Sequence, residues 1–363
     1  MNKTLALLMW LALALTPAAL AQPADWQKQW DETVAAARKE GKVVVVGSPD
    51  PVMRNVLIPS FTRQFGIQVE YIVGSSSQII GRVQTERGSG IYSIDVYLAG
   101  AGSTVTNLYP NKMLDPIKPL LIHPDVTDGK KWKRGAPAFI DPEGQYIMML
   151  FSTVNDTLFI NTDFVKPEEM RHVNDLTNPK WKGKIASQDP RLMGSGANNA
   201  VHFYVQLGPE YIKKVYVDQK PVYSRERRQL TDWLARGTYP ICLTCRADDV
   251  KPLQKEGYKL LEVFDLDGIV NRVNSAPLLM TYANKAPHPN AAKVFINWFA
   301  GKEALQTYSK EYEAVTLRTD VDESFLDPRM IPKPGVSYPD DTEFEWLLKG
   351  RSETAEKIRD LLK

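Results

Sequence analysis

Three consecutive serines, Ser75–Ser77, stand between an apolar, strand-like stretch and a helix-like run. Ser75 followed by Gln78 matches a capping box, in which the hydroxyl accepts a hydrogen bond from a free N–H group at a helix start. The spare hydroxyls and the positive end of the helix dipole also favour an anion. The stretch therefore predicts a helix cap, and Ser75 and Ser76 are candidates for one half of an anion site.

A second helix start has a similar composition. Gly194 and the three residues after it, Ser195, Gly196 and Ala197, precede an amphipathic run, and glycines let a ligand approach the backbone closely. A Gly-Ser-Gly sequence before a helix is also common in ordinary loops. Two such starts from separate domains would clamp an anion between them, so these residues are candidate ligand contacts.

Further candidates follow predicted strands. Ser48 and Gly100 end the first and third predicted strands, where open α/β sheets bind ligands. Arg246 and Asp248 follow a later strand, and the Arg246 guanidinium either forks onto a carboxylate or phosphate or is a solvated loop charge. Asn155 lies in a polar interruption of a long strand pattern and is a further polar candidate.

The chain has two cysteines, Cys242 and Cys245. On a straight strand they would point to opposite faces, too far apart to bridge, so a disulfide requires a turn between them. An oxidising compartment permits such a structural bridge. A redox C-x-x-C pair is the alternative, although the helix that such a motif uses does not start cleanly here. The sequence leaves the bridging state open.

Motifs for catalysis or a resident metal are not found. The four histidines, at 123, 172, 202 and 288, form neither H-x-x-H nor H-E-x-x-H. The sequence has no G-x-S-x-G, no phosphate-binding P-loop and no zinc spacing. We therefore expect a protein that is not an enzyme and has no cofactor, with a periplasmic enzyme as an alternative, because catalytic groups can be scattered in sequence.

The N-terminus indicates export. Lys3 precedes an apolar run from Leu5 to Leu15, and Ala19–Ala21 has the small residues of a cleavage site. We expect residues 1–21 to be a cleaved signal and the protein to be periplasmic. The net charge of +2, from 45 basic and 43 acidic residues, gives no indication of nucleic-acid binding. A monomer is expected.

The pattern of elements predicts an α/β fold. Strand-like runs at 42–48, 67–74 and 94–100 alternate with helical segments, which predicts a parallel sheet covered by helices on both faces. A length of 363 residues exceeds what one core holds, so two domains are expected. The interrupted strand pattern at 146–164 and the run at 275–284 are interpreted as two crossings between them.

The expected parts follow from these crossings. Residues 342–363 are expected to form a closing surface helix. The predicted limits are 1–21 for the signal, 22–152 plus 275–312 for the N-terminal lobe, and 153–274 plus 313–363 for the C-terminal lobe.

Several stretches carry a family resemblance over nearly the whole mature chain. They include the Ser195–Ala197 turn, KWKGKI at 180–185 and WFAGKE at 298–303. With them the chain resembles periplasmic solute-binding proteins of ABC importers, in the group that contains the ferric-ion-binding proteins. The resemblance implies a type II periplasmic-binding-protein fold: two α/β lobes, joined by two crossing hinge strands, which close on a solute and deliver it to an ABC permease in the inner membrane.

The resemblance also bears on the ligand. In the iron binders the turn that matches Ser195–Ala197 helps to hold a synergistic anion, and a tyrosine pair binds iron. That pair falls near Ala247 and Asp248 here, and the histidine that often accompanies it falls near Pro49. Ferric ion prefers anionic oxygen ligands, and Arg246 would repel it. We therefore expect a small anionic solute, either a carboxylate or a phosphorylated compound. Ferric iron with a synergistic anion is the alternative, and the choice between transport and sensing stays open.

Overall fold

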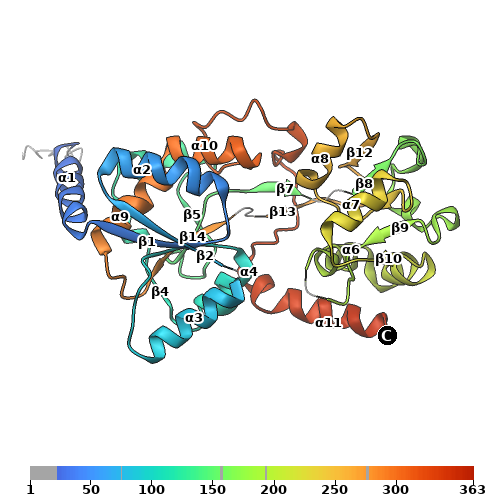
Figure 1. The fold of residues 1–363 in the computed structure, drawn as a ribbon, viewed down its shortest axis with the longest axis horizontal. Helices are drawn as coiled ribbons and strands as arrows, with labels where there is room; N and C mark the ends of the chain where they lie inside the picture. The colour runs from blue at the N-terminus through green and yellow to red at the C-terminus, as the bar shows by residue number, and fades with distance from the viewer. Residues whose placement is uncertain (1–22, 75, 156–157, 193, 275–277) are drawn as a thin grey trace, which may run out of the picture.

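The computed structural model of the protein has two lobes, which Figure 1 shows side by side along the long axis. Each lobe has its own sheet and its own hydrophobic core. No helix in the described ranges is both long and apolar enough to cross a bilayer. The structure describes residues 23–74, 76–155, 158–192, 194–274 and 278–363, so the predicted signal, residues 1–21, lies outside it.

The first lobe contains a mixed sheet in the order β2-β1-β3-β14-β6-β5, with β4 beside β14. β1 lies between β2 and β3, and its valines 43–46 are almost fully buried, as the β-branched run predicts. The sheet is parallel only across β2, β1 and β3, because β14 joins β3 antiparallel. The strands are β1 (Lys42–Gly47), β2 (Gln68–Val73), β3 (Val96–Ala99), β4 (Leu114–Asp115), β5 (Ala138–Phe139), β6 (Ile147–Met149) and β14 (Leu279–Ala283).

Helices cover the first sheet. Phe61 and Phe65 bury one face of α2, which ends at Gly66 in the left-handed conformation (φ 72°), the stop that the sequence predicts. Another helix, α1, packs against α9. The helices of this lobe are α1 (Pro23–Glu40), α2 (Ile58–Phe65), α3 (Ser76–Gly88), α4 (Ala101–Ser103), α5 (Pro124–Thr127), α9 (Pro289–Phe299) and α10 (Lys302–Tyr312).

The second lobe contains a sheet in the order β10-β9-β11-β8-β12. Its strands are β8 (Leu158–Asn161), β9 (Ile185–Ser187), β10 (Val222–Tyr223), β11 (Ile241–Cys242) and β12 (Leu260–Val263), and its helices are α6 (Ser195–Lys213), α7 (Arg227–Ala235) and α8 (Ala247–Lys255). Short 3₁₀- and π-helical segments complete the two lobes: η1 (Met53–Leu57), η2 (Thr104–Leu108), η3 (Lys118–Leu120), η4 (Gly129–Lys131), η5 (Pro167–Glu169), η6 (Val173–Thr177), η7 (Pro179–Trp181), η8 (Lys214–Asp218) and η9 (Pro328–Met330).

The strands β7 (Thr153–Asn155) and β13 (Arg272–Asn274) pair antiparallel and link the two lobes. The pattern at 146–164 therefore divides among β6, β7 and β8, with the predicted crossing at β7. The return crossing begins earlier than predicted, at β13, because the described part of 275–284 is β14, inside the first sheet. The domain limits expected from the sequence stay a prediction.

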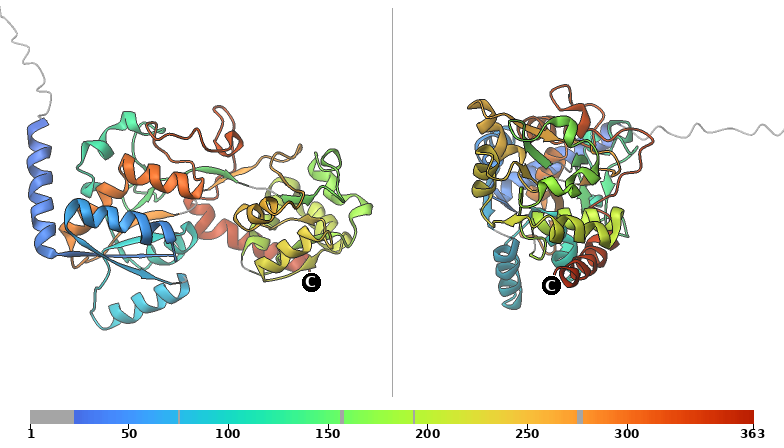
Figure 2. Two further views of the ribbon diagram at one scale, coloured as in Figure 1. Left: turned by 45° about the horizontal axis from the view of Figure 1, so that its top comes forward. Right: turned by 90° about the vertical axis from the view of Figure 1, so that its right-hand side faces the viewer.

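The C-terminal tail is helical, as predicted, but it is not only a surface helix. It consists of η10 (Trp346–Gly350) and α11 (Arg351–Leu361). Leu347 is buried in the core of the first lobe and Ile358 in the core of the second. Figures 1 and 2 show α11 running from beside the first lobe along the second. The tail is therefore a third connection between the lobes.

We expect Leu347→Ala and Ile358→Ala each to lower the free energy of unfolding by about 2–5 kcal/mol, the range for truncating a fully buried aliphatic side chain. Urea denaturation of the two variants measures this loss. Lys349→Ala, a change at an exposed position between them, is the control and should stay within about 0.5 kcal/mol of the wild type. A wild-type-like Ile358→Ala would show that the tail is not anchored in the second lobe.

Candidate functional site

A pocket opens in the first lobe at the carboxyl ends of β1 and β3. Two predicted ligand contacts, Ser48 and Gly100, both line it, together with Gly74 and Ser103. The structure thus brings these predicted residues together at the sheet edge where the sequence places them. The pocket is also lined by apolar and aromatic residues: Val46, Ile79, Ile80, Tyr97, Leu98 and Leu108.

Tyr71 closes one side of this region. Its hydroxyl donates to the carbonyl oxygen of Ser48 at 2.7 Å. A Cβ at Gly47 would lie only 2.5 Å from the Tyr71 hydroxyl, so this contact requires a glycine there. Burial, reinforced by the nearby Asp50 carboxylate, raises the pKa of Tyr71 above its usual value. Tyr71 is therefore a neutral donor that orients the turn after β1.

An oxygen-rich cluster lies behind this turn. The Asp50 carboxylate accepts from the hydroxyls of Tyr308, at 2.7 Å, and Tyr312, at 2.5 Å. Burial first, and then Asp50, raises the pKa of Tyr308 and of Tyr312, so both phenols stay protonated. These hydrogen bonds tie α10 to the end of β1. In the ranges that the structure describes, no three His, Cys, Asp or Glu side chains form a metal-ligand group.

The second lobe presents the start of α6, where the sequence predicts an anion turn. Gly194 has φ 141°, and a Cβ on Gly196 would lie 2.4 Å from the carbonyl oxygen of Gln188, so both positions require glycine. The backbone N–H of Ser195 donates to Oε1 of Gln188 at 3.2 Å. One N–H group of the helix start is thus already occupied, while the Ser195 side chain is exposed and Ala197 is buried.

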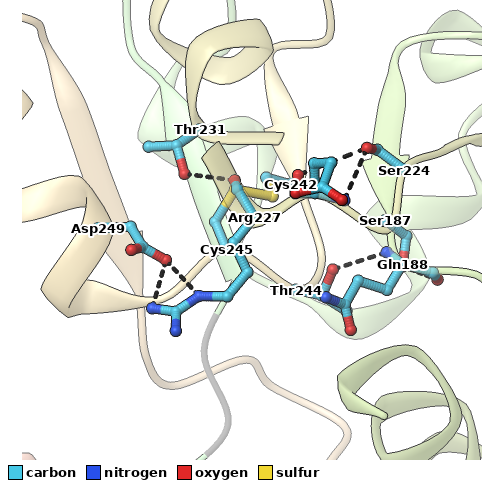
Figure 3. Close-up of a disulfide and its surroundings, with 10 residues drawn as sticks. Ser187, Gln188, Ser224, Arg227, Thr231, Cys242, Thr244, Cys245 and Asp249 are labelled. Carbon is cyan, nitrogen blue, oxygen red and sulfur yellow. Dashed lines mark hydrogen bonds and ion pairs between the residues drawn. A yellow bond between two sulfur atoms is a disulfide. The ribbon is translucent and has the colours of Figure 1, made fainter. Parts of the chain in front are cut away.

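The two cysteines form a disulfide, which Figure 3 shows close to Gln188 and Thr244. The Cα atoms of Cys242 and Cys245 are 5.6 Å apart, because β11 ends at Cys242 and the chain turns. The turn places Thr244, whose Oγ1 accepts from the backbone N–H of Gln188 at 2.8 Å. Both cysteines are buried against an apolar cluster. The bridge is therefore structural, and the redox alternative lacks an accessible thiol.

Arg246 follows the disulfide directly and is exposed at the residue before α8. It lies two residues after Thr244, which accepts a hydrogen bond from Gln188, and its role as a ligand contact stays a prediction. Arg227, the first residue of α7, is exposed and pairs with Asp249 at 2.6 Å (Figure 3).

Four predicted contacts are not fully described. Ser75 lies outside the described residues, and so do the side chains of Ser76, Asn155 and Asp248. Their backbones show that α3 begins at Ser76 and that Asn155 pairs with Arg272 across the β7–β13 ladder. The roles expected for these four side chains stay predictions.

Two arginines that the sequence reasoning missed converge on the first turn of α6. Nη1 of Arg272 donates to the carbonyl oxygen of Asn198 at 3.0 Å, and Nη2 of Arg351 donates to Oδ1 of the same residue. Arg272 also pairs with Asp341 at 3.0 Å. No local motif marks either arginine, because one comes from the hinge and the other from the tail. Only the fold brings them together.

Charge is concentrated at this junction. Burial lowers the pKa of Arg351 below its usual value, and the neighbouring charge of Arg272 lowers it further, whereas Asp341 opposes both effects. The side chain of Arg272 is only 12% exposed. His202, one turn further along α6, has its pKa lowered to about 3 by burial, with Arg272 adding to the effect. Two guanidinium groups thus lie at the start of α6, with the Asp341 carboxylate paired to one of them.

A sequence profile described as bacterial extracellular solute-binding protein matches residues 56–333, and the chain belongs to this family. Its members are the binding proteins of transporters. One curated relative is "Iron uptake protein A1" of Synechocystis sp., which is 24% identical over 131 residues. That match covers 36% of this chain and spans only 33% of the relative's length.

Two solved structures show the same two-lobed fold. The Trichodesmium protein FutA (IdiA), in complex with iron and citrate, has 18% identity and a TM-score of 0.65, with 88% of this chain and 99% of that chain covered. The periplasmic binding protein AfuA of Actinobacillus pleuropneumoniae, with fructose-6-phosphate bound, has 18% identity and a TM-score of 0.62, with 89% and 99% covered. The predicted periplasmic-binding-protein fold is confirmed.

Replacing both cysteines, with Cys242→Ala and Cys245→Ala, should lower the free energy of unfolding by about 2 kcal/mol, a modest loss because the closed loop is short. Urea unfolding of the oxidised wild type and the double variant measures this loss. Wild-type protein treated with reductant is the matched control and should resemble the variant. Native, oxidised protein that reacts with a thiol reagent would contradict the buried bridge.

His202 should make the protein less stable in acid. An ordinary histidine in the unfolded chain has a pKa of about 6.5. Because the native pKa of His202 is about 3, the unfolded state binds an additional proton as the pH falls below about 6.5. Between pH 7 and pH 5, His202→Gln should therefore lose about 2 kcal/mol less stability than the wild type. Urea unfolding at both pH values measures this difference, and equal losses would contradict the neutral, buried state.

Proposed function

We propose that this protein captures a small anionic solute between its two lobes and delivers it to an ABC permease in the inner membrane. Membership of the solute-binding family supports the capture, and the paired strands β7 and β13 are a suitable hinge. The periplasm is the expected compartment, with residues 1–21 as a cleaved signal.

The observation that carries the choice of an anion is the positive charge at the junction of the lobes. Arg272 and Arg351 meet at the first turn of α6, and among the described groups only Asp341 offsets the charge of Arg351. A solute with a carboxylate or phosphate would supply the opposite charge. The neighbouring pocket edge at Ser48 and Gly100 offers polar contacts from the first lobe.

Capture of the solute requires no covalent reaction. A solute that contacts both lobes stabilises the closed state by the difference between its affinities for the closed and open states. Rotation about β7 and β13 would bring the pocket of the first lobe toward the α6 start. The permease then distinguishes the closed form from the open one. The solute should therefore dissociate from the protein without having been chemically converted.

Ferric iron with a synergistic anion is the second candidate. It is favoured by the solved relative with iron and citrate and by the curated relative named as an iron uptake protein. In this chain the tyrosines at Asp50 are kept protonated by burial and by that carboxylate, which disfavours them as phenolate ligands. Iron presented as a citrate complex would still carry the negative charge that the arginines favour.

A thermal-shift screen tests the proposal. Fructose 6-phosphate, citrate, ferric citrate, inorganic phosphate and neutral fructose are added separately to the purified protein. An anionic solute at about 100 times its Kd should raise the free energy of unfolding by about 2.7 kcal/mol, which appears as a higher Tm. Fructose should have no effect.

The controls separate the alternatives. Unfolding, dialysing and refolding the protein removes any solute that co-purifies with it. The mass of the released solute identifies what was bound. Stabilisation by fructose alone, or by free ferric ion without any anion, would contradict anion capture. Recovery of a converted product in place of the added solute would favour the periplasmic enzyme.

A further inference from the structure

Arg351 lies where the tail and both lobes meet. It is the first residue of α11, and its Nη2 donates to Oδ1 of Asn198 in α6 of the second lobe. A Cβ built on Gly102, in α4 of the first lobe, would lie 3.9 Å from Nη1 of Arg351. This half-buried guanidinium is therefore close to both lobes at once.

The charge of Arg351 is poorly balanced. The acceptor that it uses on Asn198 is a neutral amide oxygen. Among the residues that the structure describes, the charged groups that act on it are Asp341, which already pairs with Arg272 at 3.0 Å, and Arg272 itself, which repels it. A partly buried cation next to another cation is costly unless an anion compensates both. An anionic ligand at this position would offset the free-energy cost of partly burying these two cations.

We propose that Arg351 and Arg272 together bind one oxyanion group of the solute, and that Oδ1 of Asn198 marks the position of a ligand oxygen. This inference rests on the proposed function and names the residues that determine the ligand class. The ligand oxygens take the place of the Asn198 side chain, which turns away, while Arg272 keeps its hydrogen bond to the Asn198 carbonyl oxygen.

The geometry favours an oxyanion group with several acceptor oxygens. Guanidinium groups bind planar or tetrahedral oxyanions through paired N–H donors, and two of them approach the same residue here. The preference comes from the number of acceptors: a group with several charged oxygens can accept from both guanidiniums at once, whereas a single oxygen cannot. A phosphate group and a carboxylate group share this chemistry.

A purely structural role is the competing explanation. Arg351 would then only hold the tail against α6, and its loss would change stability without changing ligand affinity. Arg359 provides a matched control, because it lies two turns further along the same helix and pairs with Glu356 at 3.4 Å on a partly exposed face. Both arginines can be replaced by glutamine with the same change in charge.

The experiment is calorimetric titration of the wild type, Arg351→Gln and Arg359→Gln with fructose 6-phosphate, citrate and fructose. We expect Arg351→Gln to weaken binding of an anionic probe by about 10- to 100-fold, the range for a hydrogen bond to a charged group. Arg359→Gln should bind as the wild type does. If only fructose 6-phosphate binds more weakly to Arg351→Gln than to the wild type, the ligand carries a phosphate. If only citrate does so, the ligand carries a carboxylate. Equal affinities in all three proteins would overturn the inference.

Asn198→Ala gives an independent test, in case Arg351→Gln does not fold. Removing the amide that competes for Arg351 should tighten binding of the same probe by about 2- to 10-fold. Unchanged or weaker binding by a folded Asn198→Ala protein would contradict the displacement. A wild type that binds neither fructose 6-phosphate nor citrate nor inorganic phosphate contradicts the proposed function itself, which distinguishes the two failures.

Discussion

The burial of one C-terminal tail in both hydrophobic cores is the constraint on which the arrangement of the lobes depends. Leu347 and Ile358 are close together in sequence, yet they are buried in different lobes. The tail also begins alongside the hinge, where the N–H of Asp341 donates to the carbonyl of Val273 at 2.9 Å. Two paired strands alone would permit a wide range of rotations. The tail restricts that range, because large movements would expose one of its buried side chains to water.

The candidate site is built from this same constraint. Arg351 can reach Asn198 only because α11 packs along α6, and it can lie near Gly102 only because η10 packs beside α4 and η2. Arg272 arrives from the other connection, β13. The charges that favour an anion are thus carried by the segments that link the lobes. The proposed ligand contacts and the movement of the lobes would therefore share the same residues, which would couple them directly.

The sequence predicted the features that local patterns determine. The valines of β1, the glycine stop after α2, and the positions of Ser48 and Gly100 at strand ends all follow from burial periodicity and backbone geometry. Arg272 and Arg351 could not be found in this way, because a lone arginine in a short strand or at a helix start has the same local pattern as a solvated one. The mixed sheet was missed for a similar reason, since the direction of β14 depends on its return from the second lobe.

The disulfide has a practical consequence for any biochemical work on the protein. Cys242 and Cys245 hold the turn that carries Thr244, which positions Gln188 against the first amide of α6. Thiols stay reduced in the bacterial cytoplasm, so this covalent tie forms only under oxidising conditions. Protein purified from the cytoplasm, or stored with dithiothreitol, would have a looser turn next to the candidate site. Affinities obtained from such a preparation would describe a different ensemble from that of the exported, oxidised molecule.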